Sequence, residues 1–166
     1  TKDYYSKISE MGKYLEQEGM PLAYHHHMGT VIESQEETIR LLENTHDSVK
    51  LTLDTGHMLF ANGDSINILK NFGERVIHIH CKDMRKKILD MSLKNDLSFR
   101  EAFLKGAFTV PGDGCINYHP LFKILKDNNY SGWLVVEAEQ DPIKANPFKY
   151  AKIGFNYLTN ELRKVG

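Results

Sequence analysis

Four short stretches of the chain alternate apolar and polar residues, a pattern typical of strands buried on one face. They are Leu22 to Gly29, Val49 to His57, Val76 to Asp83 and Leu134 to Asp141. In the third stretch, alternation predicts that His78 and His80 share one face. The opposite face then carries the apolar residues Ile77, Ile79 and Cys81. Buried polar groups need partners, so the histidine face is expected to line a polar site.

Segments with helical spacing of apolar residues separate these stretches. Ser34 and Glu37 match a capping box that starts a helix, and Asp64 is placed to cap the next one. After Thr55 to His57 the pattern indicates a loop. The expected helices cover residues 4–18, 35–44, 65–72, 118–128 and 147–163.

The segment 85–108 differs from the rest of the chain. It shows helical spacing but no strand pattern, and it is interpreted as a helical insertion of one or two short helices.

Strands that alternate with helices predict an α/β fold with a parallel sheet and right-handed crossovers. The 166 residues are enough for a single domain, 1–166. A complete eight-unit TIM barrel needs about 250 residues. The four strand–helix units therefore predict the C-terminal half of such a barrel. Either a missing N-terminal half or a homo-oligomer is expected to close the sheet, because open parallel edges are unfavourable.

Composition excludes several classes of protein. No stretch approaches the ~20 apolar residues of a membrane span, and a net charge of −1 without a basic patch argues against nucleic-acid binding. Cys81 and Cys115 lack metal or redox spacing, which indicates reduced thiols in a cytoplasmic protein. The chain opens at Thr1 in a helical pattern without an initiator Met, so a fragment of a longer protein is expected.

Polar residues at the carboxyl ends of the strands carry the candidate chemistry, since parallel α/β folds place functional side chains there. We expect four strands that end together to bring a set of nitrogen and oxygen donors around one divalent metal ion. The predicted ligands are His25, Asp54, His80 and Glu137.

Other interpretations of these residues remain open. Asp54 is equally suited to cap the turn that follows it. Alternation places His25 and His27 on the same side of the first strand, so it does not choose between them. His78 lies one layer below His80 and is interpreted as a hydrogen-bonded core histidine.

A second set of polar residues lies further toward the expected rim. Lys82 is placed to hold a substrate oxygen, and Asp83 either orients Lys82 or caps the next segment. His57 faces a substrate or lies in a surface loop. Glu139 is an acid or base, or a solvated rim residue. The turn Gly112-Asp113-Gly114 lacks the lysine of a phosphate-binding loop.

Together, five sequence motifs resemble the inosose dehydratase family and, more broadly, the xylose-isomerase-like TIM barrels of sugar isomerases and epimerases. They are YHHHMGT, LDTGHMLFANGD, VIHIHCKDMR, VPGDG and LVVEAEQDP. The resemblance covers nearly all of this chain but only the C-terminal half of the family's barrel. It implies metal ligation by Glu, Asp, His and Glu on successive strands. Asp54, His80 and Glu137 match the last three, whereas His25 replaces the first glutamate, which favours manganese or cobalt over magnesium.

The resemblance implies a hydro-lyase that removes water from 2-keto-myo-inositol (scyllo-inosose), a small cyclic keto-polyol, in inositol catabolism. Glu137, Glu139, His27 or His57 would move the protons, while Lys82 holds a substrate oxygen. One alternative is a keto-sugar isomerase or epimerase of the same superfamily. Another is an inactive half-barrel that only binds a sugar or a partner. Nucleic-acid repair on this scaffold is disfavoured by the lack of basic surface.

Overall fold

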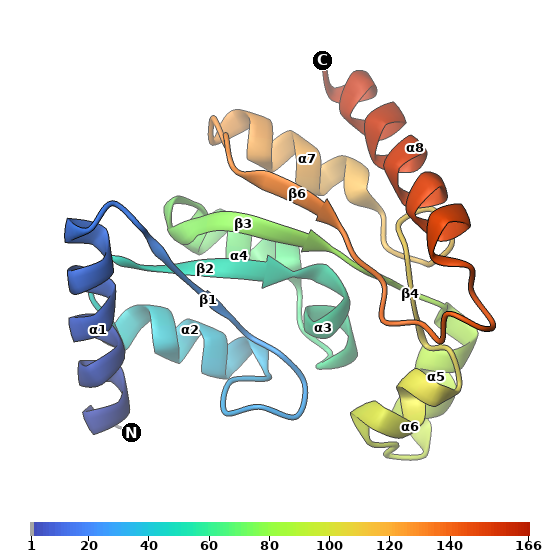
Figure 1. Ribbon diagram of the computed structural model, residues 1–166, viewed down its shortest axis with the longest axis horizontal. Coiled ribbons are helices and arrows are strands. Elements are labelled where there is room, and N and C mark those ends of the chain that lie inside the picture. The colour runs from blue at the N-terminus through green and yellow to red at the C-terminus, as the bar shows by residue number, and fades with distance from the viewer. Residues whose placement is uncertain (1) are drawn as a thin grey trace.

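The computed structural model describes residues 2–166 and contains a four-stranded parallel sheet flanked by helices (Figure 1). In Figure 1 the strands of this sheet run toward the same side of the molecule. In spatial order the strands are β1 (Leu22–His25), β2 (Val49–Asp54), β3 (Val76–Cys81) and β6 (Trp133–Val136). Each neighbouring pair is parallel. The predicted α/β class with strand–helix units is therefore confirmed.

The helices are α1 (Lys2–Gln17), α2 (Gln35–Asn44), α3 (Thr55–Phe60), α4 (Ser65–Phe72), α5 (Lys86–Lys94), α6 (Phe99–Leu104), α7 (Tyr118–Asp127) and α8 (Pro147–Val165). A short 3-10 turn, η1 (Gly73–Arg75), precedes β3. Residues 2–166 contain no helix whose length and apolarity would let it cross a membrane.

Local capping signals start the helices where the sequence predicted them. The hydroxyl of Ser34 accepts from the backbone N–H of Glu37, and the Glu37 carboxylate accepts from the Ser34 N–H, which completes the capping box of α2. The Asp64 carboxylate caps α4 by accepting from the backbone N–H of Ile66. The loop expected after His57 is wrong, because α3 covers Thr55–Phe60. The helix begins where the Asp54 carboxylate accepts from the backbone N–H of His57 and caps it.

The two faces of the sheet differ strongly. One face packs against α2, α4, α7 and α8 and forms the main hydrophobic core. The other face carries the histidines and carboxylates at the strand ends. The buried strand residues of the core are Leu51, Leu53, Val76, Ile79 and Cys81.

A register shift changes the predicted faces of β3 at one position. Leu51 pairs with Val76, but the next residue, Thr52, pairs with His78. The strand therefore bulges at Ile77, as an extra residue in one partner requires. Because of this bulge, Val76 is buried in the core and Ile77 is only half-buried, so the placement of Ile77 on the covered face was wrong.

Two very short antiparallel strands bracket the segment that carries α5 and α6. They are β4 (Asp83–Met84) and β5 (Phe108–Thr109). The sequence predicted no strand within segment 85–108, and this is wrong at Phe108, which belongs to β5 and pairs with Met84. Phe60, Met84, Leu89 and Phe108 form a separate small core that fastens this segment to α3. That the segment is an insertion stays a prediction.

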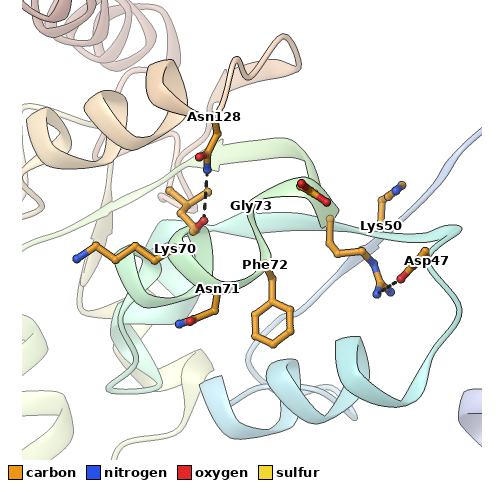
Figure 2. A pocket seen from close by; sticks show the side chains of 10 residues that line it. Asp47, Lys50, Lys70, Asn71, Phe72, Gly73 and Asn128 are labelled. Carbon is orange, nitrogen blue, oxygen red and sulfur yellow. Dashed lines mark hydrogen bonds and ion pairs between the residues drawn. The ribbon is translucent and has the colours of Figure 1, made fainter.

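A hollow of about 580 Å³ lies at the amino ends of β2 and β3, away from the histidine face (Figure 2). Its lining residues are Asp47, Lys50, Leu69, Lys70, Asn71, Phe72, Gly73, Glu74, Arg75 and Asn128. Figure 2 shows the ion pair that ends at Asp47. Its partner is Arg75, 3.1 Å away.

Arg75 joins the end of α2 to the start of β2. Its guanidinium donates to the backbone oxygens of Leu42, His46 and Val49 and to the hydroxyl of Thr45. These acceptors include carbonyls at the carboxyl end of α2, which no basic residue of its own last turn serves.

We expect Arg75→Ala to lower the free energy of unfolding by about 2–4 kcal/mol, because it leaves several partly buried carbonyls without donors. Urea-induced equilibrium unfolding measures this loss. Lys70→Ala is the matched control, since Lys70 lines the same hollow from an exposed position. A change below about 0.5 kcal/mol for Arg75→Ala would contradict this account.

Candidate functional site

The four predicted metal ligands meet at the carboxyl ends of their strands. The Asp54 Oδ2 atom lies 3.5 Å from His25 Nε2 and 3.5 Å from His80 Nδ1. His80 Nδ1 lies 2.9 Å from Glu137 Oε2. Strand pairing explains this, because Asp54 is in register with His80 and β6 follows directly beside β3.

These atoms fit a bound cation. Each of the four atoms, His25 Nε2, Asp54 Oδ2, His80 Nδ1 and Glu137 Oε2, is buried and makes ion-pair contacts with another of the four or with Lys82 in place of a regular hydrogen bond. Buried polar atoms without regular hydrogen bonds call for an explanation, and a bound ion is one. Ligands about 2.1 Å from one ion lie about 3–4 Å from one another. The pairs His25–Asp54, Asp54–His80 and His80–Glu137 lie 3.5, 3.5 and 2.9 Å apart. The donor set of imidazoles and carboxylates also suits a divalent transition metal.

Lys82 lies in the centre of the site rather than at its rim, which corrects the sequence prediction. Its side chain is fully buried, although it carries a charge. The Nζ atom lies 3.1 Å from Asp54 Oδ2, 3.2 Å from Glu137 Oε2 and 3.1 Å from Glu139 Oε2. It also lies 2.9 Å from His57 Nε2. Because an ammonium group can only donate, His57 Nε2 is its acceptor.

A second group of donors lies beside the first. His27 Nε2 is 3.2 Å from Glu139 Oε1, and His57 Nε2 is 3.4 Å from Glu139 Oε2. The two imidazole rings are close, with centroids 3.7 Å apart. His57 is completely buried, so the surface-loop interpretation of this residue was wrong. Glu139 is largely shielded, with 22% of its side chain exposed, so it is not a freely solvated rim residue.

Burial and charge act in opposite directions on the titratable groups of the site. Burial favours a raised pKa for Asp54, but the nearby imidazoles and Lys82 hold that pKa well below its usual value. Burial disfavours the Lys82 ammonium, yet the surrounding carboxylates keep its pKa above the usual value. Glu139 is ionised because His57 and Lys82 outweigh burial and lower its pKa to about 2. Hydrogen bonds to Asp54 and Glu137 raise the pKa of His80 to about 9, so its ring also carries a positive charge at neutral pH. The carboxylates of Asp54, Glu137 and Glu139 still outnumber the cations of Lys82 and His80, so a divalent ion that replaces the His80 proton would be attracted to the site.

Two anchors of the site were not predicted. His26 is fully buried, and burial lowers its pKa to about 3, so the ring is neutral. Its Nε2 atom accepts from the backbone N–H of Asp54 and links the end of β1 to the end of β2. Tyr118, also buried, shares a hydrogen bond with Thr55, and both hydroxyls contact the backbone oxygen of Lys82. No pattern in the sequence indicates that these residues, which are far apart in the chain, contact one another.

Gly56 makes room for the lysine side chain. A Cβ atom at this position would lie 2.7 Å from Cγ of Lys82 and 2.9 Å from its Cδ. Position 56 therefore needs a glycine, because the aliphatic part of the Lys82 side chain passes directly over it.

Aromatic side chains cover the outer part of the site. Phe99 from α6 packs against the rings of His27 and His57, at 5.3 and 5.6 Å between centroids. Phe108 packs against His57 at 5.4 Å and lies 5.8 Å from Lys82 Nζ. The sequence signal for these residues was only the helical spacing of segment 85–108.

His78 stays outside both groups of donors, as expected. It stacks edge-on beside His80, at 5.3 Å between ring centroids, and is only half-buried. No hydrogen bond of its ring is present among the described residues, so the hydrogen-bonded core interpretation is not supported. His78 is only half-buried because it lies on the open face of the four-stranded sheet, where no further strand of the sheet covers it.

Asp83 does not orient the Lys82 ammonium. Its Oδ1 atom accepts from the backbone N–H groups of Met84 and Ile116. A Cβ atom at Gly114 would overlap this carboxylate, so the glycine-rich turn packs directly on Asp83. The residue therefore fastens loop 110–117 to β4.

Residues 1–161 match the family model described as the xylose isomerase-like TIM barrel. An inosose dehydratase of Clostridium perfringens is 48% identical over 152 residues, which are 91% of this chain and 51% of that protein. An inosose dehydratase of Mesomycoplasma hyopneumoniae is 52% identical over 154 residues, with the same coverage. The rhizopine catabolism protein MocC of Rhizobium meliloti is 42% identical, covering 98% of this chain and 50% of that protein. The chain thus spans about half the length of the curated relatives it matches.

Solved structures share the fold at low sequence identity. The probable 3-DHS dehydratase AsbF of Bacillus anthracis superposes with a TM-score of 0.72 at 17% identity, over 95% of this chain and 56% of that chain. The IolI protein with a binding zinc atom gives 0.69 at 19% identity, over 96% of this chain and 55% of that chain. Together with the family model, they confirm that these four strands correspond to part of a TIM barrel.

The buried carboxyl of Asp83 generates a prediction about pH. Burial outweighs the backbone donors and raises its pKa to about 6. Because this value lies above the unfolded value of about 3.9, the stabilising contribution is complete below about pH 4 and is lost as the pH rises through about 6. Asn keeps an oxygen acceptor but cannot ionise. We therefore expect the free energy of unfolding of Asp83→Asn, relative to that of the unmodified protein, to rise by about 2–3 kcal/mol between about pH 4 and pH 7.5.

Urea-induced unfolding of both proteins at the two pH values measures this difference. Asp127→Asn, at an exposed position, is the control and should show no such trend. A difference between Asp83→Asn and the unmodified protein that does not vary with pH would refute the prediction.

Proposed function

The chain belongs to the xylose isomerase-like TIM barrel family, and we propose that it is the catalytic C-terminal half of a metal-dependent dehydratase. The observation that carries the proposal is the convergence of four buried donor atoms, from His25, Asp54, His80 and Glu137, at one end of the sheet. The curated relatives named inosose dehydratase, at 45–52% identity, support this reaction class over other members of the family.

We propose 2-keto-myo-inositol, a cyclic keto-polyol, as the substrate, and manganese or cobalt as the metal. The names of the relatives support the substrate. The zinc atom in the IolI protein supports a divalent ion on this fold. Two imidazoles and two carboxylates form a borderline donor set that suits manganese, cobalt or zinc better than magnesium.

Dehydration next to a ketone removes a proton from the α carbon and a hydroxyl from the next carbon. A divalent ion held by these residues would supply Lewis-acid charge for the ketone oxygen. His27, His57 and Glu139 lie beside the proposed ion site. They are suited to move the protons, because the ion would be held by other residues. Glu137 shares its Oε2 atom with the metal set and is the less available carrier.

The aromatic cover favours this chemistry. Phe99 and Phe108 pack over His27 and His57 and keep bulk water away from the rings. Exclusion of water strengthens the local electrostatic interactions and protects a reactive intermediate. Lys82 can hold a substrate oxygen only if one of its present partners turns away, since four acceptors already surround its three protons.

We propose that further strands close the sheet into a barrel, either from more chain or from a second copy. β1 and β6 are its edges and pair on one side only. Large apolar side chains are exposed on the edge strand β6 and on α8, which packs against it: Trp133 at 75%, Phe148 at 80% and Phe155 at 64%. Together with the two open strand edges, these side chains support a further partner for this part of the sheet.

We expect His80→Ala to lower metal affinity at least about 10-fold and turnover of 2-keto-myo-inositol about 100-fold or more, because a ligand is lost. The measurement uses the protein at its full natural length, with metal content by plasma mass spectrometry and product by absorbance of the diketone. His78→Ala is the matched control, since His78 lies on the same strand face two residues away and outside the site. Its metal content and turnover should stay unchanged.

Unchanged metal content and turnover in His80→Ala would remove the metal-dependent model. A keto-sugar isomerase or epimerase of the same fold would begin with the same proton transfer but release an isomer of equal mass. Mass spectrometry of the product therefore separates the two activities: loss of one water supports the dehydratase, and an isomer overturns it.

A further inference from the structure

Three overlapping groups of donors in this site have the composition of a metal centre. They are Asp54, His80 and Glu137 (the first group); His25, Asp54 and His57; and His27, His57 and Glu139 (the second group). The first group and the second group share no residue. A set of two imidazoles and one carboxylate is itself a common arrangement for zinc and related ions. The proposed function uses only the first group as ligands.

The geometry of the second group suits an ion as well as that of the first. Glu139 offers one oxygen 3.2 Å from His27 Nε2 and the other 3.4 Å from His57 Nε2. Donors about 2.1 Å from a tetrahedral ion lie about 3.4 Å apart. The rings of His27 and His57 are tilted at 43° with centroids 3.7 Å apart, and both Nε2 atoms lie beside the Glu139 carboxylate.

The Lys82 ammonium lies between the two groups and supplies a positive charge to both. Its Nζ atom is 2.9 Å from His57 Nε2 and 3.1 Å from Glu139 Oε2 on one side. On the other side it contacts Asp54 and Glu137 at 3.1 and 3.2 Å. A metal ion bound by His57 and Glu139 would have to displace this ammonium, because both need the same acceptor atoms.

We propose that the Lys82 ammonium holds the place of a second cation, and that loss of its charge turns His27, His57 and Glu139 into a second metal site. The proposal goes beyond the proposed function and depends on it only for the presence of an ion in the first group. Lys82 then acts as a positioning residue that keeps the centre mononuclear. Its charge leaves the two imidazoles and Glu139 free to exchange protons.

The surroundings of Lys82 are built to keep the ammonium there. Gly56 leaves space for the side-chain stem, which any larger residue would obstruct. Thr55 and Tyr118 hold the backbone oxygen of Lys82 with buried hydroxyls. The Lys82 side chain is fully buried, so removing it would leave a cavity rather than a position that bulk water already reaches. A mobile surface lysine would need none of these contacts.

The test counts Co²⁺ ions in the protein at its full natural length. We expect Lys82→Met, which keeps the length of the side chain but removes the charge, to bind about two ions per chain where the unmodified protein binds about one. Lys82→Gln serves as a second neutral variant. Equilibrium dialysis against Co²⁺, followed by plasma mass spectrometry, gives the number, and the visible absorption of Co²⁺ reports new imidazole ligands.

Two variants control for the position of the added ion. Lys82→Arg keeps the positive charge and should bind the same number of Co²⁺ ions per chain as the unmodified protein. Lys82→Met combined with His27→Ala removes a ligand of the second group only and should lose the added ion. Lys82→Met combined with His80→Ala removes a ligand of the first group and should keep it.

An unchanged number of ions in both neutral variants would overturn the proposal. So would a neutral variant that stays unfolded in saturating Co²⁺, because the second ion should replace the missing charge. If the unmodified protein binds no ion but the neutral variants gain one that depends on His27, the proposed metal site of the first group fails while this inference stands.

Discussion

A buried positive charge among converging carboxylates is the constraint on which this structure depends. The ammonium of Lys82 is completely buried and within 3.2 Å of Asp54, Glu137 and Glu139. Three carboxylates brought this close together without a cation would repel one another strongly in a poorly solvated site. The lysine reduces that repulsion, and the remaining negative charge creates a place for a divalent ion. Both the folding of the strand ends and the proposed chemistry follow from this balance.

The sheet creates this balance by separating apolar and polar residues on its two faces. The helix side is a continuous core, so the ends of β2 and β3 are held rigidly beneath the polar groups. The bulge at Ile77 adjusts the register so that His80 lies beside Asp54. His26 and Thr55 then fix the strand ends through backbone hydrogen bonds. A site held by rigid elements keeps its donors in place before any ligand arrives.

The division of the site into two donor groups explains how one cluster can serve different roles. His25, Asp54, His80 and Glu137 bring buried donor atoms together around one point, as a group that binds an ion does. His27 and His57 contact Glu139 and pack against Phe99, which suits a group that exchanges protons away from water. The Lys82 ammonium lies between the two groups. Under the proposed function, the first group would supply Lewis-acid chemistry through its ion and the second would transfer protons.

Local sequence determined the strand–helix order, the capping box of α2 and the polar residues at the strand ends, because alternation and capping depend on near neighbours. It also identified Asp54, His80 and Glu137 as residues that converge, since parallel strands must end on one side. Tertiary structure alone decided that Lys82 is central, that His57 is buried on a helix rather than in a loop, and that Val76 replaces Ile77 in the core. Each of these depends on contacts between distant segments, such as Lys82 with Gly56 and Glu139, and no periodicity within one segment reports on them.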